Sequence, residues 1–525
     1  MWKSDIKLGI NTIKMDNRKV RVRFAPSPTG PLHMGGVRTA LFNYLFAKKN
    51  NGKFILRIED TDQTRYVQGA EDYIIESLKW CGIQIDEGVE EGGPYGPYRQ
   101  SDRKEIYKEF AERLIESGNA YYAFDTAEEL DTMRERLKEQ KSSVQQYNAI
   151  TRGSMNNSLA LSEEETQNLV NSDAKYVIRF KMPDNEEIVV EDIIRGTVKV
   201  NTNQLDDKVL FKSDGMPTYH LANVVDDHLM KISHVIRGEE WLPSLPLHVM
   251  LYRAFGWDET KPDFAHLPLL LKPSGKGKLS KRDGDALGFP VFPMEWTDPK
   301  TGDISRGYRE DGYFPEAFNN MLAFLGWNPG TEEEILSMRD LISEFDLNKV
   351  HKAGAKFDHE KAKWFNHKYL VGKSNEKLAN LYKNILKDKG VKADDSFVLK
   401  VVSLIKERAS FVFDFWDQSY FFFQAPTEYD KKVVKKRWKE GTPGILSDLK
   451  KQLELVDEFN HDAIEKAIQD FLEGKEFGMG QVMNPFRLTL VGAGIGPGVL
   501  EIAELLGKDE TLNRLQAGID NIKRE

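Results

Sequence analysis

The sequence contains a single cysteine, Cys81, among its 525 residues. One thiol excludes an internal disulfide and any zinc site built from several thiolates. We therefore expect a reducing compartment and predict a cytoplasmic protein. Long apolar runs are also missing. The first twenty residues lack the apolar core of a secretory signal, and a long uncharged stretch, 488–500, contains four glycines and a proline. No membrane segment is predicted.

Positive charge is not in excess either, because 74 Lys and Arg face 83 Asp and Glu, for a net charge of -9. This balance excludes indiscriminate binding to polyanions but allows a local basic groove. A hydrophobic content of 40%, with 11% aromatic residues, excludes a disordered chain. The length predicts roughly three or four domains.

Regular apolar patterning begins only at Arg21, so residues 1–20 are predicted to be a tail, with Met15 as an alternative start. A strand, RVRFA, a turn rich in Pro and Gly, an amphipathic helix and a strand over 54–62 then indicate a parallel sheet. Parallel-sheet signals return at 234–241, after a segment of different character. Helical periodicity dominates from about Phe314.

These shifts predict an α/β multidomain protein with a Rossmann-like parallel sheet, an inserted α+β domain and an all-α C-terminal region. The predicted boundaries are 1–20 for the tail, 21–116 and 217–285 for the two halves of the sheet domain, 117–216 for the insert, 286–370 for a connecting region and 371–525 for the helical region.

The first motif that could carry chemistry is PSPTGPLHMGG, residues 26–36. Gly35 and Gly36 in the first turn of a helix would leave backbone N–H groups unobstructed for an anion, with His33 beside them as a donor. An ordinary Pro/Gly turn after a strand is the alternative.

The second motif is GKGKLSKRDG, which carries Lys276, Lys278, Lys281 and Arg282 on a polar loop. Such a loop can close over a polyphosphate and neutralise charge that develops there. A solvated basic loop is the alternative.

Together the two motifs resemble the HIGH and KMSKS signatures of class I aminoacyl-tRNA synthetases. Longer segments extend the resemblance to the bacterial glutamyl-tRNA synthetases, in order from about Arg21 to the C-terminus. They are RFAPSPTGPLHMGGVRTALFNYLFA, RIEDTD, GGPYGPYRQSDR, FKSDGMPTYHLANVVDDHLM, RGEEWL, KLSKR and NPFRLTL.

The resemblance implies activation of L-glutamate by ATP to glutamyl-adenylate and transfer to the 3′ end of tRNA(Glu), with AMP and pyrophosphate released. Magnesium would accompany ATP without a dedicated protein cage. The insert would bind the acceptor end, the connecting region would contact the stem, and the helical region would read the anticodon. A monomer without membrane contact is expected.

The resemblance also implies roles for individual residues. The catalytic set is His33, Gly35, Lys278, Ser280 and Lys281. The ATP-binding set is His33, Gly35, Gly36, Glu240, Trp241, Leu242 and Lys281. The glutamate-binding set is Arg23, Ala25, Ser27, Glu59, Tyr219, Asn223 and Arg237. In the last set, Arg23 would face the side-chain carboxylate of the substrate and Glu59 its ammonium group.

Some positions depart from the family pattern. Gly36 stands where HIGH ends in histidine, and Leu279 and Arg282 replace the Met and final Ser of KMSKS. The AYYAF region has no cysteine, so no zinc is predicted in the insert. Segment 288–307 is longer than the usual connection in the family, and its role is open.

Several other clusters invite functional interpretations. The carboxylates Glu59, Asp60 and Asp62 could hold a metal, but caps or arginine partners are favoured. The set of His220, Asp226, Asp227 and His228 is interpreted as structural. GAGIGPG (492–498) is predicted to be a turn between helices, since no βαβ unit surrounds it.

The segment 431–439, KKVVKKRWK, has six basic residues in nine, with Trp438 among them. Contact with RNA through phosphates and stacking, and a solvated helix face, both remain open. Arg408 corresponds loosely to a family residue that inspects the anticodon.

Three other functions fit the sequence less well. Glutaminyl-tRNA synthetase is disfavoured by the APSPTG form of the first motif and by Arg23. A shortened relative that glutamylates a modified tRNA base is disfavoured by the long helical region. A non-catalytic RNA-binding paralogue is disfavoured because His33, Lys278 and Lys281 are all retained. Whether a tRNA(Gln) is also charged stays open.

Overall fold

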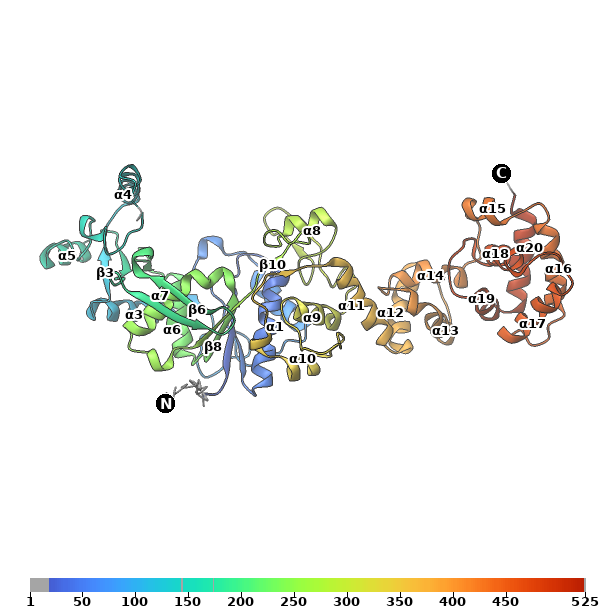
Figure 1. Cartoon of the computed structure of the whole chain (residues 1–525), viewed down its shortest axis with the longest axis horizontal. Helices are drawn as coiled ribbons and strands as arrows, with labels where there is room; N and C mark the ends of the chain where they lie inside the picture. The colour runs from blue at the N-terminus through green and yellow to red at the C-terminus, as the bar shows by residue number, and fades with distance from the viewer. Residues whose placement is uncertain (1–17, 143–144, 173, 524–525) are drawn as a thin grey trace, which may run out of the picture. The chain divides into compact units, whose positions relative to one another are not determined.

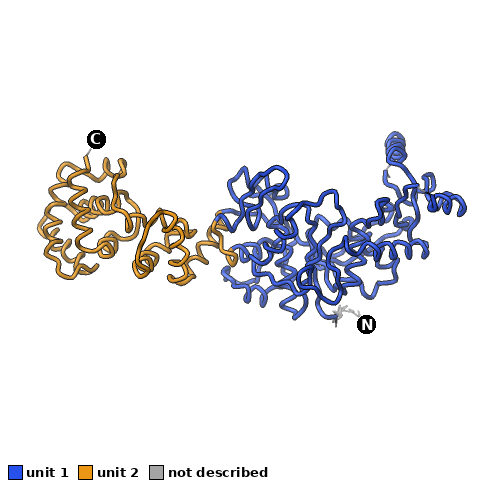
Figure 2. The backbone as a smooth tube through the Cα atoms, turned by 180° about the vertical axis from the view of Figure 1, so that it is seen from behind, with its two compact units in different colours: residues 1–311, 318–359 blue, residues 312–317, 360–525 orange. Residues whose placement is uncertain are grey.

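The computed structural model describes residues 18–142, 145–172 and 174–523 (Figure 1). The predicted tail is thus described only from Arg18 onward, and Met15 lies outside the described residues. The chain divides into two compact units, residues 1–311 with 318–359 and residues 312–317 with 360–525 (Figure 2). None of the helices described is long and apolar enough to cross a membrane.

The first parallel segment of unit 1 consists of β1 (Arg21–Phe24), α1 (Met34–Lys49) and β2 (Lys53–Leu56). The strands pair in parallel register, from Arg21 opposite Lys53 to Phe24 opposite Leu56. Lys48 and Lys49 occupy the last turn of α1, where cations complement the helix dipole. The predicted strand–helix–strand order is confirmed.

The second strand is shorter than the predicted 54–62, because regular pairing ends at Leu56. Beyond it the backbone turns to different neighbours. Arg57 N–H donates to Phe24 O, Ile58 N–H to Tyr98 O and Glu59 N–H to Pro26 O. Residues 57–59 are therefore held by two separate segments, residues 24–26 and Tyr98, and this places Glu59 beside the turn that follows β1.

The second half of the sheet domain contains β8 (His234–Gly238), α7 (Leu245–Ala254) and β9 (Asp263–Leu267), with β8 and β9 parallel. They belong to a four-stranded sheet of order β6-β5-β9-β8. Between β8 and α7, Glu239–Ser244 forms a 3-10 helix, so the α-helix begins only at Leu245.

Segment 117–216 contributes to two sheets. The strands β3 (Ala120–Ala123), β4 (Val177–Phe180) and β7 (Val209–Phe211) form an antiparallel sheet of their own. The hairpin of β5 (Glu187–Asp192) and β6 (Gly196–Asn201) instead joins β9, through Asp192 opposite Phe264.

Unit 1 also contains further helices and short strands (Figure 1). Its further helices are α2 (Ala70–Trp80), α3 (Lys104–Glu116), α4 (Ala127–Glu139), α5 (Glu163–Val170), α6 (Tyr219–Leu229), α8 (Lys281–Leu287) and α10 (Met338–Glu344), and α9 (Pro315–Phe324) spans the boundary between the units. Its short strands are β10 (Leu270–Leu271), β11 (Trp296–Thr297), β12 (Ile304–Ser305) and β13 (Ala355–Lys356).

The prediction that Lys281 and Arg282 lie on a loop is wrong, because both belong to α8. The cause is a local capping arrangement. The Asp283 carboxylate accepts a hydrogen bond from Ser280 N–H at 2.9 Å, and Asp283 N–H donates to Ser280 O. This pairing starts a helix immediately after Ser280.

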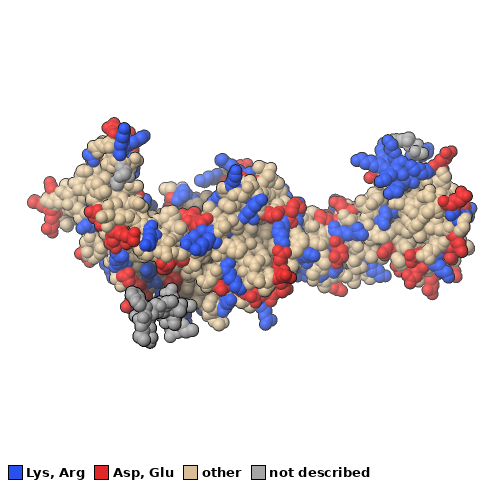
Figure 3. Space-filling model, viewed as in Figure 1, with Lys and Arg blue, Asp and Glu red and all other residues tan. Residues whose placement is uncertain are grey.

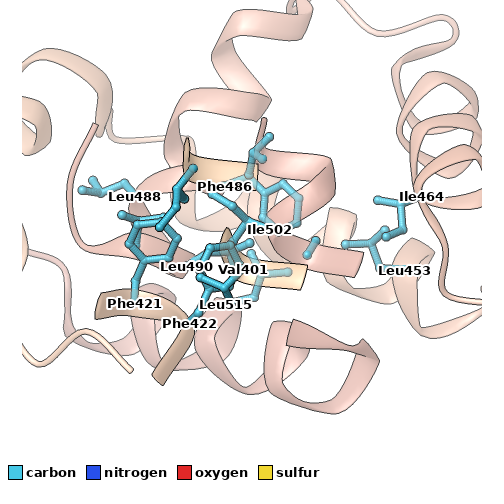
Figure 4. Packing of buried hydrophobic residues seen from close by; sticks show 14 of the residues in the cluster. Val401, Phe421, Phe422, Leu453, Ile464, Phe486, Leu488, Leu490, Ile502 and Leu515 are labelled. Carbon is cyan, nitrogen blue, oxygen red and sulfur yellow. The ribbon is translucent and has the colours of Figure 1, made fainter. Parts of the chain in front are cut away.

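Unit 2 is helical, as predicted. Its elements are α11 (His359–Gly372), α12 (Asn375–Asp388), α13 (Asp395–Ile405), α14 (Asp414–Phe423), α15 (Lys431–Arg437), α16 (Thr442–Glu454), α17 (His461–Leu472), α18 (Met479–Val491), α19 (Val499–Leu506) and α20 (Lys508–Asn521). Figure 4 shows Phe486, Ile502 and Leu515 packed in its core. Residues 492–498 connect α18 to α19, so the predicted turn is confirmed.

Candidate active site

A cavity of about 700 Å³ lies where β1 and β8 end and α1 begins. Both halves of the sheet domain line it, as expected for a ligand site at the carboxyl ends of parallel strands. Of the residues predicted from the sequence, it is lined by Arg23, Ala25, Ser27, His33, Gly35, Gly36, Glu59, Tyr219, Asn223, Arg237, Glu240, Trp241, Lys278, Ser280 and Lys281. Leu242 is not among the lining residues and packs instead against the hydrophobic core of unit 1.

His33 occupies the N-cap of α1. Its Nδ1 accepts a hydrogen bond from Gly35 N–H at 3.2 Å, so the proton of the neutral ring is on Nε2. That Nε2 is buried and has no hydrogen-bond partner within the described chain. Burial, and then the nearby Lys278, lower the pKa of His33 to about 4. His33 is therefore a neutral donor with an unused N–H.

The expectation of unobstructed backbone donors at the start of α1 is wrong. Met34 N–H donates to Val291 O at 2.8 Å, Gly35 N–H donates to His33 Nδ1, and Gly36 N–H donates to His33 O. A Cβ at Gly36 would lie 2.5 Å from Leu32 Cδ1, so a larger residue there would have to displace the Leu32 side chain. An anion at this end would meet His33 Nε2 and the helix dipole.

One end of the cavity is a buried ionic network. Arg23 is 3% exposed, and its Nε lies 3.0 Å from Asp227 Oδ1. Arg57 is fully buried and bridges Asp227 at 2.8 Å and Glu59 at 2.9 Å. Asn223 joins the network by donating to Glu59 Oε1 and accepting from Arg23. The two guanidinium groups thus share Asp227 and Glu59, and Arg57 Nε also lies 3.8 Å from Asp226 Oδ2.

The environment acts differently on the two carboxylates. Burial raises the pKa of Glu59, although Arg57 and Arg23 oppose the shift. Burial also disfavours the charge on Asp227, but Arg23 and Arg57 prevail and hold its pKa below the ordinary value. Arg57 was not predicted from the sequence as a site residue. The charge run RIEDTD at a strand end was its only signal.

Arg237 lies beside this network and is 5% exposed. Its Nη1 donates to Tyr219 Oη at 2.7 Å, and its Nη2 donates to Trp241 O and Ser244 Oγ. The Tyr219 ring lies 4.6 Å from the ring of Trp241. The tyrosine is therefore held between an arginine and an aromatic wall.

The opposite end of the cavity carries exposed lysines. Lys278 Nζ lies 2.8 Å from Glu240 Oε1, with side chains 59% and 41% exposed. Leu279 is buried and its N–H donates to Leu270 O, which anchors the strand-like part of the motif. Lys281 begins α8 and is exposed. The lysines are thus carried by an anchored backbone with solvated side chains.

Segment 288–307 forms an additional wall of the site. The Phe292 ring contacts the edge of His33 at 6.0 Å between centroids, and Tyr73 Oη donates to Met294 O at 2.6 Å. A second cavity of about 570 Å³ lies here, lined among others by His33, Lys281, Phe292 and Trp296. The role of this segment was left open by the sequence.

The other acidic and histidine clusters are engaged in structural contacts. Asp226 is buried and accepts from Arg103, Gln100 and Tyr107. His228 stacks on Trp257 at 3.6 Å. No group of three or more His, Cys, Asp or Glu residues suited to a metal occurs in the part of the chain that is described. The Asp60 carboxylate accepts from Ser101 N–H, Asp62 pairs with Arg65, and His220 Nδ1 lies 3.2 Å from His248 Nε2.

In unit 2, α15 carries the basic run, and Figure 3 shows Lys and Arg side chains gathered over it. Lys435, Lys436 and Arg437 are exposed. Trp438 is only 2% exposed because its ring packs in the core of the unit, so this residue is not available to stack on a base, which was one of the two alternatives left open by the sequence. Arg408 is exposed at the end of a 3-10 helix.

Comparison with known proteins adds independent observations. Residues 19–364 match the family model of the class I tRNA synthetases (E and Q), catalytic domain, and residues 373–519 match an anticodon binding domain. A glutamate--tRNA ligase of Christiangramia forsetii is 60% identical over 96% of this chain and 99% of its own length. One of Phocaeicola vulgatus is 59% identical, over 97% of this chain and 100% of its own.

Solved structures agree. The crystal structure of a glutamate tRNA ligase from Elizabethkingia meningosepticum in complex with its amino acid has a TM-score of 0.92 at 55% identity, covering 96% of this chain and 100% of that chain. The glutamate-tRNA synthetase from Elizabethkingia anophelis has a TM-score of 0.89, at the same identity and coverage. The chain belongs to the class I tRNA synthetases (E and Q), in the family of the bacterial glutamate--tRNA ligases.

Proposed function

We propose that this protein activates L-glutamate with ATP and transfers the glutamyl group to the 3′ end of tRNA(Glu). The observation that carries the proposal is one cavity with buried arginines at one end and solvated lysines at the other. In the first step the substrate α-carboxylate attacks the α-phosphate of ATP, which forms glutamyl-adenylate and releases pyrophosphate. In the second, a ribose hydroxyl of the tRNA attacks the mixed anhydride and AMP leaves.

The charge balance at the buried end supports a dicarboxylate substrate. The positive charges of Arg23 and Arg57 are matched by Asp227 and Glu59. The groups that accept hydrogen bonds from Arg237 are all uncharged. Arg237 therefore contributes an unmatched positive charge, which favours glutamate over uncharged glutamine. Arg23 would take the side-chain carboxylate and Glu59 the ammonium group.

At the nucleotide end, His33 would donate its unused Nε2–H to the phosphates, and Lys281, with Lys278, would neutralise the charge that develops as pyrophosphate leaves. Glu240 and Trp241 would line the adenosine pocket. Gly35 would let the nucleotide approach the backbone, and Ser280 would shape the lysine motif. Magnesium would enter with ATP as part of the substrate, and no zinc is proposed. The rate enhancement would come from the alignment of glutamate with ATP and from positive charges placed near the phosphates.

We assign the remaining parts of the chain by the same proposal. Segment 117–216 would bind the acceptor end of the tRNA, 286–370 would contact its stem and 371–525 would read its anticodon. The proposed enzyme is a monomer. Its substrates, ATP and tRNA, favour the cytoplasm as the site of reaction.

Exchange of labelled pyrophosphate into ATP tests the proposal. With tRNA present, we expect glutamate to support exchange, and Lys281→Ala to lower the maximal rate about 10²- to 10³-fold. Lys300→Ala, which removes a nearby exposed lysine outside the cavity lining, is the matched control. Exchange with glutamine and not with glutamate would overturn the substrate assignment. Charging of separated tRNA species then decides whether tRNA(Gln) is also a substrate.

A further inference from the structure

Three neighbouring strands each place one polar side chain at the same edge of the sheet. Asp192 ends β5, His266 lies near the end of β9, and Arg237 lies near the end of β8. The sheet order β5-β9-β8 makes them successive neighbours, and Arg237 is directly opposite His266 in the register. Only Arg237 of the three lines the cavity.

Hydrogen bonds join the three side chains. Arg237 Nε donates to His266 Nε2 at 3.0 Å, and His266 Nδ1 lies 2.6 Å from Asp192 Oδ2. An arginine Nε–H can only donate, so His266 Nε2 must accept and carries no proton. The proton is therefore on Nδ1 and is donated to Asp192. The contacts by themselves select one neutral tautomer of the ring.

The aspartate is fixed in turn by the backbone. Asp192 is 3% exposed, and its Oδ1 accepts from Ile194 N–H at 3.0 Å and Arg195 N–H at 2.8 Å. These bonds orient the carboxylate so that Oδ2 faces His266. Burial opposes its charge, but the bonds from His266 and the backbone hold the pKa of Asp192 below its ordinary value. Asp192 is therefore an ionised acceptor in a single orientation.

The geometry points to Asp192 and His266 as positioning residues for glutamate recognition, which fix the orientation of Arg237 while leaving its charge unmatched. The inference rests on the proposed function, in which Arg237 attracts the substrate. A carboxylate placed directly on Arg237 would orient it but would also neutralise it. Here the neutral imidazole of His266 lies between Asp192 and Arg237. It fixes the orientation of the guanidinium through its hydrogen bond, and it keeps the negative charge of Asp192 at the far side of the ring.

The contacts of Arg237 show what the orientation provides. Its four hydrogen bonds, to His266, Tyr219, Trp241 and Ser244, use four of the five N–H groups of a guanidinium. The remaining hydrogen is on Nη1, the same nitrogen that contacts Tyr219 in the cavity wall. Loss of the Nε bond would let the plane of the guanidinium rotate and misdirect that hydrogen.

The Asp192→Asn variant tests the inference most sharply. The Asn oxygen must still accept from the backbone N–H groups of Ile194, Arg195 and His266, so its NH₂ would face His266 Nδ1. The proton of the ring would then move to Nε2, and two donors, His266 Nε2–H and Arg237 Nε–H, would face each other without an acceptor. We expect KM for glutamate to rise about tenfold to hundredfold, with KM for ATP little changed, because a hydrogen bond to a charged group is lost.

Two readouts separate tautomer control from simple structural support. In ¹⁵N-histidine NMR, the His266 signals should report a proton on Nδ1 in the natural protein and on Nε2 in Asp192→Asn. His266→Gln supplies an amide oxygen that can accept from Arg237 whatever its neighbour is. In that background, Asp192→Asn should add little to KM for glutamate, a non-additive pair.

Three results would overturn the inference. They are a proton on Nε2 in the natural protein, an unchanged KM for glutamate in Asp192→Asn, and equal effects of Asp192→Asn with and without His266→Gln. Because the tautomer is read without substrate, it is independent of the proposed function. Absence of glutamate-dependent exchange in the natural protein would refute that function instead.

Discussion

The two ends of the cavity hold charge in opposite ways. At the end proposed to bind the amino acid, Arg23 and Asp227 form an ion pair whose side chains are 4% and 2% exposed. At the end proposed to bind the nucleotide, the pair of Lys278 and Glu240 is largely solvated. A desolvated, fully bonded network can discriminate between similar small substrates, because an analogue leaves buried groups unpaired. Solvated lysine side chains can change position as negative charge develops on phosphates, and this mobility suits the release of pyrophosphate.

The comparison also predicts how each end contributes to stability. Removing one partner from a buried pair leaves an uncompensated charge in a low-dielectric environment, which is strongly destabilising. An exposed pair is screened by water and loses side-chain entropy, so it contributes little. Substitutions at the two ends should therefore differ severalfold in their effect on the free energy of unfolding.

The largest effect is expected for Asp227→Ala, which removes the shared partner of Arg23 and Arg57. We expect the free energy of unfolding to fall by about 3–5 kcal/mol, because both guanidinium groups stay buried. Denaturant titration followed by tryptophan fluorescence measures it. A decrease of less than about 1 kcal/mol in the free energy of unfolding would mean that water reaches the Arg23–Asp227 pair. The two ends of the cavity would then not differ in their contribution to stability.

An intermediate effect is expected on acidification, through His33. Its pKa of about 4 lies below the ordinary 6.5, so between these values the unfolded chain binds the proton and the folded protein does not. Stability should therefore fall as pH falls from 6.5 towards 4. Between pH 7 and pH 4.5, His33→Gln should lose less stability than the natural protein, by up to about 3 kcal/mol. Parallel stability curves for the two proteins would contradict the assignment of His33 as a neutral donor.

The smallest effect is expected for Glu240→Gln, which keeps the shape of the side chain and removes the partner charge of Lys278. The free energy of unfolding should change by less than about 1 kcal/mol. Repeating the Asp227→Ala titration beside it, in the same buffer, gives the matched comparison. A loss as large as that of Asp227→Ala would show that both ends depend equally on pairing.

Much of the architecture and of the cavity could be predicted from the sequence. Strand and helix periodicity near Arg21 and His234 depends on adjacent residues, and the two motifs that contain His33 and Lys281 are continuous in the chain. The start of α8 at Lys281 could also have been predicted, because Ser280 and Asp283 form a local capping pair. Each of these features is determined by residues close together in the sequence, so it can be predicted without the tertiary structure.

What the sequence alone determined is therefore the order of elements, the family and most residues of the cavity wall. The tertiary structure decided which side chains form pairs. Arg23 and Asp227 are 204 residues apart in the chain, and His266 meets Asp192 across 74 residues. Such contacts follow from strand order and register, as does the junction of β5 with β9. The burial of Trp438 likewise depends on the helices packed around it, which no local pattern specifies.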